Sequence, residues 1–364
     1  MQFSPILSNY FAKYFITYVM AIFLAIIAVI FLLDSVELLR RGVNKEGISL
    51  GLIFEMAMLK APNIGYKTLP FAVLFGSMMV FSKIVKNKEL VAVQSAGVTM
   101  WQVLVPAISV VLLLGLFWIM VINPISSALT AKFEMLENRV LRHQNNALTV
   151  SSEGLWIREK HAEGYSVLHA RGISNDGETL SNVTIFLFNK QNMFSSRIDS
   201  SQVKLKPGYW NLIDAVEMSK NGVPSHNDEF KLPTQLTVGN IQDSFASPSS
   251  MSFWELPDFI NILEEAGFTA VRHRLHWHSL MASPVLLCAM VLIAAAFALR
   301  SSARIGTIPR LIAALFFGFF LYFMTDLVFA LGLSSRIPEI LAAWTPAIVT
   351  ILIGITSLLH LEDS

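Results

Sequence analysis

Seven basic side chains lie in one half of the first two long apolar segments or just after the third, where cations could meet the phosphates of an amphipathic molecule. They are Arg40, Arg41, Lys60, Lys67, Lys132, Arg139 and Arg142. Lys60 and Lys67 are seven residues apart, so a helix would carry both on one face. Each cation on its own could simply extend to the water at a membrane interface. As a group above apolar walls, they suit a substrate that combines acyl chains with phosphates.

A second cluster lies in the segment KIVKNKELVAVQSAGVTMWQ, residues 83–102. Leu90, Val93 and Gly97 would share one helical stripe, and Lys86 is spaced to pair with Glu89. Gly97 is placed to end this short helix. Such a helix either rests on lipid headgroups or inserts into a cytoplasmic motor subunit. The residues of this coupling hypothesis are Lys86, Lys88, Glu89, Leu90, Val93 and Gly97.

The sequence has no motif for nucleotide hydrolysis. Stretches that begin at Gly42 and Gly172 are near a phosphate-binding loop, but Ile48 and Glu178 replace the required lysine. No Ser-His-Asp order or H-E-x-x-H motif is present. We therefore expect no catalytic, cofactor-binding or metal-binding residue in this chain. If transport uses ATP, a partner subunit would bind the ATP and Mg²⁺.

Three histidines in RHRLHWHS invite a metal interpretation. His273 and His276 would share a helix face, but His278 points elsewhere and no carboxylate completes the set. With Trp277 they are better interpreted as a belt at the membrane interface.

Asp326 interrupts the fifth apolar segment. A buried carboxylate there is costly unless it is paired, so a function is the first hypothesis to consider. Arg336 could reach it from the end of the segment. The sequence favours such structural pairing over a proton relay.

Six apolar segments must position these groups. Of the 364 residues, 54% are apolar and 15% are charged, whereas soluble proteins have about 25% charged residues. A spanning helix needs about 20 apolar residues. The expected spans are 14–33, 50–82, 101–122, 279–299, 311–333 and 340–359, the second bent near Pro62 and Pro70 and the third closed by Asn123-Pro124. We predict a polytopic α-helical membrane protein.

The stretch between the third and fourth spans has a different pattern. Short alternating runs are separated by turn signals; the runs are GLWIRE, YSVLHA, VTIFLFN, WNLIDAVEM and LPTQLTV, and the turns NDG, KPG and KNG. They predict an inserted all-β domain of jelly-roll type, followed by a helix over 254–267. The domains are then a first transmembrane half (1–131, coupling helix about 84–97), the β domain with its return segment (132–275), and a second transmembrane half (276–364).

Basic residues in the short loops predict the orientation. One side has seven, Lys13 and those in 83–88 and 300–310, whereas the other has Arg40, Arg41, Lys45 and Arg336. The richer side faces the cytoplasm, which places both termini there and the β domain on the outer side. Cys288 is the only cysteine, so no intrachain disulfide is possible. The net charge of +1 argues against nucleic-acid binding.

These features resemble the LptF/LptG (YjgP/YjgQ) permeases, the membrane subunits of the ABC-type lipopolysaccharide exporter of Gram-negative bacteria. The resemblance covers the whole chain, and KNKELVAVQSAG (86–97) is its most specific element. KAP (60–62), LPFAVLFG (69–76), GLWIRE and RIPEILAAWTPAI (336–348) also match, and the last two lean towards LptG. LLRRG matches a basic pair near lipid A, although Asp34 and Glu37 add acid to a segment that should be more basic.

The resemblance implies a non-catalytic permease subunit that extracts lipopolysaccharide from the inner membrane and passes it to a periplasmic jelly-roll bridge. The implied partners are an LptB-like ABC ATPase dimer that receives Glu89, an LptF-like second permease, and LptC-like and LptA-like jelly-roll proteins. The first, second and fifth spans would line the cavity. Two alternatives stay open, an ion-coupled secondary transporter of an amphipathic lipid or solute and a membrane-anchored enzyme that uses the histidines.

Overall fold

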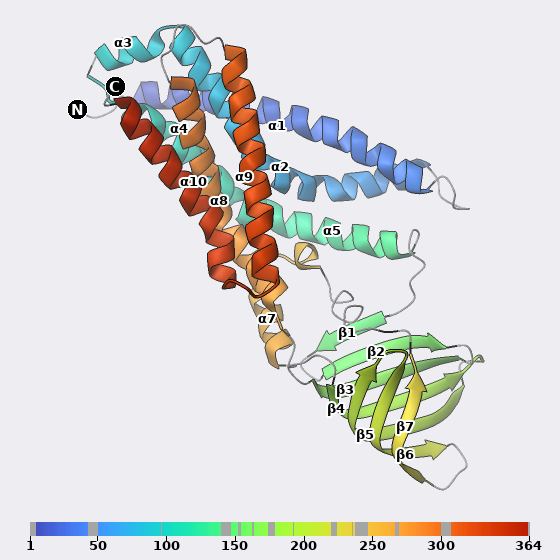
Figure 1. The fold of residues 1–364 in the computed structure, drawn as a ribbon. Helices are drawn as coiled ribbons and strands as arrows, with labels where there is room; N and C mark the ends of the chain where they lie inside the picture. The colour runs from blue at the N-terminus through green and yellow to red at the C-terminus, as the bar shows by residue number, and fades with distance from the viewer. Residues whose placement is uncertain are drawn as a thin grey trace. The chain divides into compact units, whose positions relative to one another are not determined.

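The computed structural model describes most of the chain in two units. The described residues are 5–42, 50–95, 97–139, 147–151, 154–161, 164–173, 179–191, 193–219, 224–234, 236, 247–265, 269–299 and 307–362. One unit comprises Met1–Phe133 with Arg274–Ser364, and the other comprises Glu134–His273. The first is helical and the second contains a β-sheet (Figure 1).

Six helical spans of the described chain are long and apolar enough to cross a membrane, as the sequence predicts. They are α1 (Pro5–Gly42), α2 (Leu50–Lys86), the continuous run of α4 (Met100–Phe117), η1 (Trp118–Ile122) and α5 (Asn123–Glu137), then α8 (Val271–Leu299), α9 (Thr307–Leu333) and α10 (Glu339–Glu362). A short helix, α3 (Glu89–Ser95), connects the second span to the third.

The third span continues beyond Asn123-Pro124, where the sequence predicts its end. A proline inside a helix cannot donate a hydrogen bond, and its ring clashes with the carbonyl four residues earlier. The chain accommodates Pro124 with the π turn η1, in which the Asn123 N–H donates to the Trp118 carbonyl. Helix α5 then continues to Glu137 and adds four turns to the span.

Helices α1 and α2 pack side by side because small residues let them approach. Gly76 of α2 lies so close to α1 that a Cβ atom would be 2.7 Å from the Val19 Cα. At the C-terminal end of α2, Lys83 Nζ donates to Tyr18 Oη over 3.1 Å and lies 4.7 Å from the centroid of the Tyr14 ring. Packing and a polar anchor thus fix this end of the helix pair.

Large apolar side chains lie on the outside of the helical unit as well as in its core. On α9 the exposed residues are Phe316, Phe319, Phe320 and Phe323, each more than half accessible. Such a surface is unfavourable in water but matches the hydrocarbon of a bilayer. The chain is therefore a multi-pass membrane protein.

The second unit contains one antiparallel sheet of seven described strands. They are β1 (Ala147–Ser151), β2 (Gly154–His161), β3 (Gly164–Ile173), β4 (Thr179–Asn189), β5 (Phe194–Lys206), β6 (Tyr209–Ser219) and β7 (Ser225–Pro233). Each strand pairs with its neighbour in sequence, for example Leu168 with Ile185 and Ile185 with Ile198. Alternate side chains fill one buried face, including Trp210 and Leu212. Short segments η3 (Pro248–Ser250) and α7 (Leu256–Glu265) follow the sheet.

The inserted β domain is confirmed, and its strand order adds detail that the sequence does not contain. The consecutive order makes the described strands a meander, without the crossing connections of the Greek keys in a jelly roll. Four predicted runs form β2, β3, β4 and β6, whereas LPTQLTV contributes only Leu232 and Pro233 to β7. Gly208 (φ +88°) forms the predicted KPG turn. The NDG and KNG turns lie outside the described residues.

Candidate functional site

The two arginines near the end of α1 are paired within their own helix. Arg40 Nη2 lies 2.8 Å from Glu37 Oε2, and Arg41 Nε lies 2.8 Å from Glu37 Oε1. Spacings of three and four residues bring these side chains onto one face. The Glu37 carboxylate therefore offsets part of the positive charge that the sequence predicts at this position.

Two of the predicted cavity lysines pair with acids on neighbouring helices. Lys60 Nζ of α2 lies 2.5 Å from Asp34 Oδ1 of α1. Lys132 Nζ of α5 lies 2.8 Å from Glu55 Oε1 of α2. These pairs connect α2 to a helix on each side. We call the whole set the α1–α2–α5 charge network, made up of Asp34, Glu37, Arg40, Arg41, Glu55, Lys60 and Lys132.

The Asp34–Lys60 pair is the better enclosed of the two. The Asp34 side chain is 16% exposed and Lys60 is 38% exposed, against 47% and 55% for Glu55 and Lys132. Lys60 Nζ also lies 5.8 Å from the centroid of the Phe133 ring. The second oxygen, Asp34 Oδ2, is buried and accepts no hydrogen bond from the described residues. The carboxylate therefore depends on Lys60 for its stabilisation.

The remaining predicted cations differ from the network. Lys67 is exposed on α2 and forms no ion pair or hydrogen bond with the described residues. Arg139 is exposed in a helical turn after α5 and also has no ion pair within the described chain. Arg142 lies outside the described residues. Among the predicted substrate cations of the helical unit, Lys67 is thus the one without an acidic partner in the described residues.

The sequence identified the cations, but it did not predict which acidic residues pair with them. Glu37 could have been paired from its spacing to the arginines alone. By contrast, Asp34 is 26 residues from Lys60, and Glu55 is 77 residues from Lys132. No local pattern indicates contacts at such separations.

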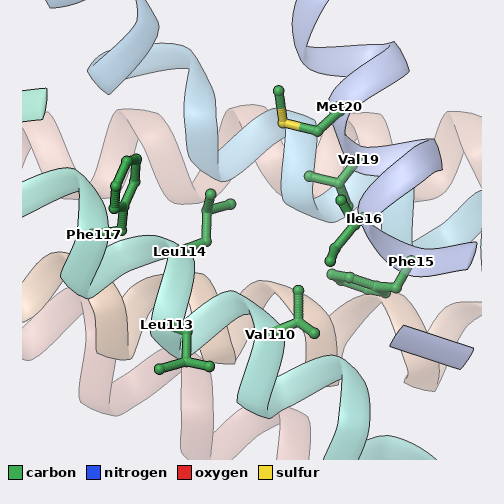
Figure 2. A pocket seen from close by; sticks show the side chains of 8 residues that line it. All are labelled: Phe15, Ile16, Val19, Met20, Val110, Leu113, Leu114 and Phe117. Carbon is green, nitrogen blue, oxygen red and sulfur yellow. The ribbon is translucent and has the colours of Figure 1, made fainter. Parts of the chain in front are cut away.

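A purely apolar hollow of about 290 Å³ lies between α1 and α4. Figure 2 shows its lining, which comes from two stretches of helix and contains no nitrogen or oxygen in its side chains: Phe15, Ile16, Val19, Met20, Val110, Leu113, Leu114 and Phe117. Such a hollow suits hydrocarbon and has no group to recognise a charged headgroup.

The predicted coupling segment forms a seven-residue helix, α3, with a defined turn at each end. Lys88 enters it in the left-handed conformation (φ +59°), and its carbonyl accepts the first helical hydrogen bond, from Ala92. Gly97 (φ +82°) ends it as predicted, because the Gly97 and Val98 N–H groups donate to Gln94 and Val93. Thr99 then caps α4 through a capping box with Gln102.

One side of α3 rests on the helical core and the other is exposed. Leu90 and Val93 pack against the main hydrophobic cluster, as their shared stripe predicts. Val91 is 64% exposed, and none of the seven residues is fully buried. The Glu89 carboxylate accepts a hydrogen bond of 2.9 Å from Asn87 Nδ2, instead of the predicted ion pair with Lys86. The segment therefore has an acid and exposed apolar surface on the side away from the core.

The remaining predicted groups do not assemble a site. No group of three His, Cys, Asp or Glu residues in the described chain could hold a metal ion. His273 is buried, with its ring centroid 5.1 Å from that of Phe259. Asp326 is exposed on α9 and accepts a hydrogen bond from the Tyr322 hydroxyl. The described residues contain no ion pair between Asp326 and Arg336.

The comparisons with known proteins agree with the helices and sheet described above. Residues 9–360 match the model of the family described as lipopolysaccharide export system permease LptF/LptG. The chain is also 22% identical over 287 residues to the lipopolysaccharide export system permease protein LptG of Haemophilus influenzae, and the match covers 78% of each protein. Because the family model extends over nearly the whole chain, this protein belongs to the LptF/LptG permease family.

Proposed function

We propose that this chain is a non-catalytic permease subunit that extracts lipopolysaccharide from the inner membrane and passes it to a periplasmic jelly-roll bridge. ATP would be hydrolysed by a partner subunit, and this chain would bind neither nucleotide nor metal. The observation that carries the proposal is the family match over residues 9–360, which includes six spans and the β domain.

Helix α3 is the proposed contact with an LptB-like ATPase dimer. Capped turns hold it between α2 and α4, and Leu90 and Val93 anchor one side on the core. A rigid element of this kind can transmit motion of a partner to the spans. Glu89 is the proposed docking residue, with Lys86 and Lys88, both exposed, beside it.

The α1–α2–α5 charge network is the proposed site for the phosphorylated headgroup. Arg40 and Arg41 both contact the Glu37 carboxylate, and their guanidinium groups are exposed enough to meet a phosphate. The other two pairs are neutral, and a phosphate must displace a carboxylate to reach Lys60 or Lys132. The network therefore favours a multiply charged anion over a singly charged one.

The β domain is the proposed start of the bridge. Among the described strands, β1 and β7 form the two edges of the sheet. An edge strand can pair with a strand of another chain through its free backbone groups. LptC-like and LptA-like proteins would continue the sheet in this way, and a second, LptF-like permease would complete the membrane cavity.

The proposed orientation places both termini and α3 in the cytoplasm. The start of α1, the end of α10 and α3 lie at the same end of the helical unit (Figure 1). Lys83, Lys86 and Lys88 lie at or beyond the end of α2 on this side. This concentration of basic residues supports the orientation.

Purification of the tagged chain in mild detergent, with mass spectrometry of bound proteins and lipids, tests the proposal. We expect a soluble ATPase, a second six-span permease and lipopolysaccharide. Recovery of this chain alone with ordinary phospholipid would contradict the exporter function and favour an ion-coupled transporter. Replacement of His273, His276 and His278 with alanine tests the alternative that this chain is an enzyme. We expect this variant to bind the same lipid as the natural chain.

A further inference from the structure

Lys67 of α2 and Asp326 of α9 are opposite charges within membrane-spanning helices. Both are exposed, and neither forms an ion pair with the described part of the chain. A charge inside a membrane is costly without a partner or access to water. The two residues therefore need water or a counter-ion, and a counter-ion could come from each other or from outside.

The packing of α2 against α9 brings these two positions to the same level. A Cβ atom on Gly318 would lie 3.0 Å from Leu74 Cδ2. The Phe71 ring centroid lies 6.0 Å from that of Phe319 and 5.8 Å from that of Tyr322. Residues earlier in α2 thus contact residues later in α9, so the two helices are antiparallel.

One further turn along each helix leads to the two charges. Lys67 is four residues before Phe71, and Asp326 is four residues after Tyr322, so each lies on the face that makes the last aromatic contact. The hydrogen bond from the Tyr322 hydroxyl turns the Asp326 carboxylate towards this face. Beyond the crossing, α2 leaves α9 and runs beside α1 (Figure 1). The charges thus lie where the two helices begin to separate.

Tyr66, next to Lys67 on α2, is half-buried, and its hydroxyl lies near Ser279 and Ser283 of α8. On α9, Val328 and Phe329 pack against a cluster of Leu275, Ala342 and Ala343. Each helix therefore has its own neighbours at this level, and a change in the α2–α9 separation would change the distance between Lys67 and Asp326.

We propose that Lys67 and Asp326 form an ion pair that closes the α2–α9 seam when no anionic headgroup is present. Approach of the helices joins the charges, and their separation releases Lys67 to bind a phosphate. The release step rests on the proposed lipopolysaccharide function, whereas the closing step does not. The pair would prevent a charged lysine from facing hydrocarbon in the empty chain.

Crosslinking in membranes that contain the full chain tests the proximity. In a Cys288→Ala background, Lys67→Cys with Asp326→Cys should crosslink through a short bifunctional maleimide about as well as Asp34→Cys with Lys60→Cys. Lys67→Cys with Val328→Cys is the matched control, because Val328 packs on the other side of α9. A yield no higher than that of this control would overturn the proposal.

Amine labelling of Lys67 tests the charge interaction without removing the lysine. Asp326→Asn should raise the labelling of Lys67 severalfold and leave that of Lys60 unchanged, because Lys60 keeps Asp34. Equal labelling of Lys67 in both chains would mean that Asp326 meets a cation of another protein, and would overturn the pair.

Labelling of Lys67 in the presence of added lipid tests the release step separately from the ion pair. Purified lipopolysaccharide should protect Lys67 from labelling in both the natural chain and Asp326→Asn, whereas phosphatidylglycerol vesicles should protect it less. Equal protection by both lipids assigns Lys67 to phosphates in general and overturns its role in substrate choice. No protection by either lipid contradicts the release step and leaves the crosslinking result standing.

Discussion

The charge network of α1, α2 and α5 and the coupling segment around α3 contain the same residue types in different settings. In the network, carboxylates bind cations on the same or a neighbouring helix, and Asp34 is only 16% exposed. In the coupling segment, Glu89 accepts a hydrogen bond from Asn87, two residues before it, and no residue of α3 is buried. Charges that hold helices together should affect stability, whereas charges on an exposed helix should affect binding.

Removal of Lys60 should cause the largest loss of stability. Lys60→Ala leaves Asp34 without a counter-ion in a mostly buried position. Removing one member of a fully buried pair costs about 3–5 kcal/mol, and solvent at Lys60 reduces our expectation to about 2 kcal/mol. Unfolding of the purified chain by sodium dodecyl sulfate measures this loss.

Two further variants test whether the loss in Lys60→Ala comes from the unpaired, mostly buried Asp34. Asp34→Ala together with Lys60→Ala should cost less than the sum of the single changes, because it leaves no unpaired charge. Lys132→Ala disrupts a more exposed pair and should cost under about 1 kcal/mol. An equal loss for Lys60→Ala and Lys132→Ala would show that burial does not distinguish the two pairs.

Glu89→Ala should weaken binding of the ATPase and leave stability nearly unchanged, the opposite of Lys60→Ala. We expect the ATPase recovered with the chain to fall about tenfold, equivalent to about 1.4 kcal/mol. Resistance to unfolding should change little, because the hydrogen bond of Glu89 with Asn87 is exposed. Gln94→Ala, on the same helix and also exposed, is the matched control and should retain the ATPase. Normal recovery with Glu89→Ala would remove the proposed docking role.

Gly97→Ala should loosen the coupling segment by about 1 kcal/mol. A Cβ atom here would meet no other atom within 4 Å, so the cost comes only from the left-handed backbone, at φ +82°. Hydrogen exchange at the Gln94-bonded N–H of residue 97 should become faster. Lys88→Gly relieves a comparable strain at φ +59° and should have a smaller effect of opposite sign. Unchanged exchange with Gly97→Ala would show that this turn is not needed to end α3.

The parts that could be predicted from sequence depend on local physics. The spans follow from uncharged runs, and the end of α3 follows from one glycine. β5 was missed because FSSRIDSSQVKLK is mostly polar, although Ile198 and Val203 fill the sheet core. The continuation of the third span was missed because a π turn accommodates Pro124. Both depend on packing that no short window contains.

The candidate site shows the same division between local and distant information. The basic residues were visible in the sequence, and Glu37 was within one turn of its arginines. The pairing of Asp34 with Lys60 depends on how two long helices align, which Gly76 and Val19 help to set. The sequence therefore identified the charges, and only the fold showed which of them offset one another.

The smallest change in stability should come from the arginines at the end of α1. Arg40 and Arg41 are 77% and 56% exposed in their side chains, and their partner Glu37 is on the same helix. Replacing both with glutamine should leave unfolding unchanged, because surface pairs contribute little. Lys67→Gln should also change unfolding little, because Lys67 and its proposed partner Asp326 are both exposed and exposed pairs contribute little.

Lipid crosslinking then separates the arginines from Lys67. A phosphate that binds Arg40 or Arg41 must compete with Glu37 on the same helix, whereas Lys67 is released from Asp326 when the proposed α2–α9 seam opens. Lys67→Gln should therefore reduce crosslinking to lipopolysaccharide more than the double arginine change does. A larger effect of the arginines would mean that their shared net charge, rather than the availability of a single cation, attracts the headgroup. In that case the network itself, with its carboxylates in place, would be the recognition site.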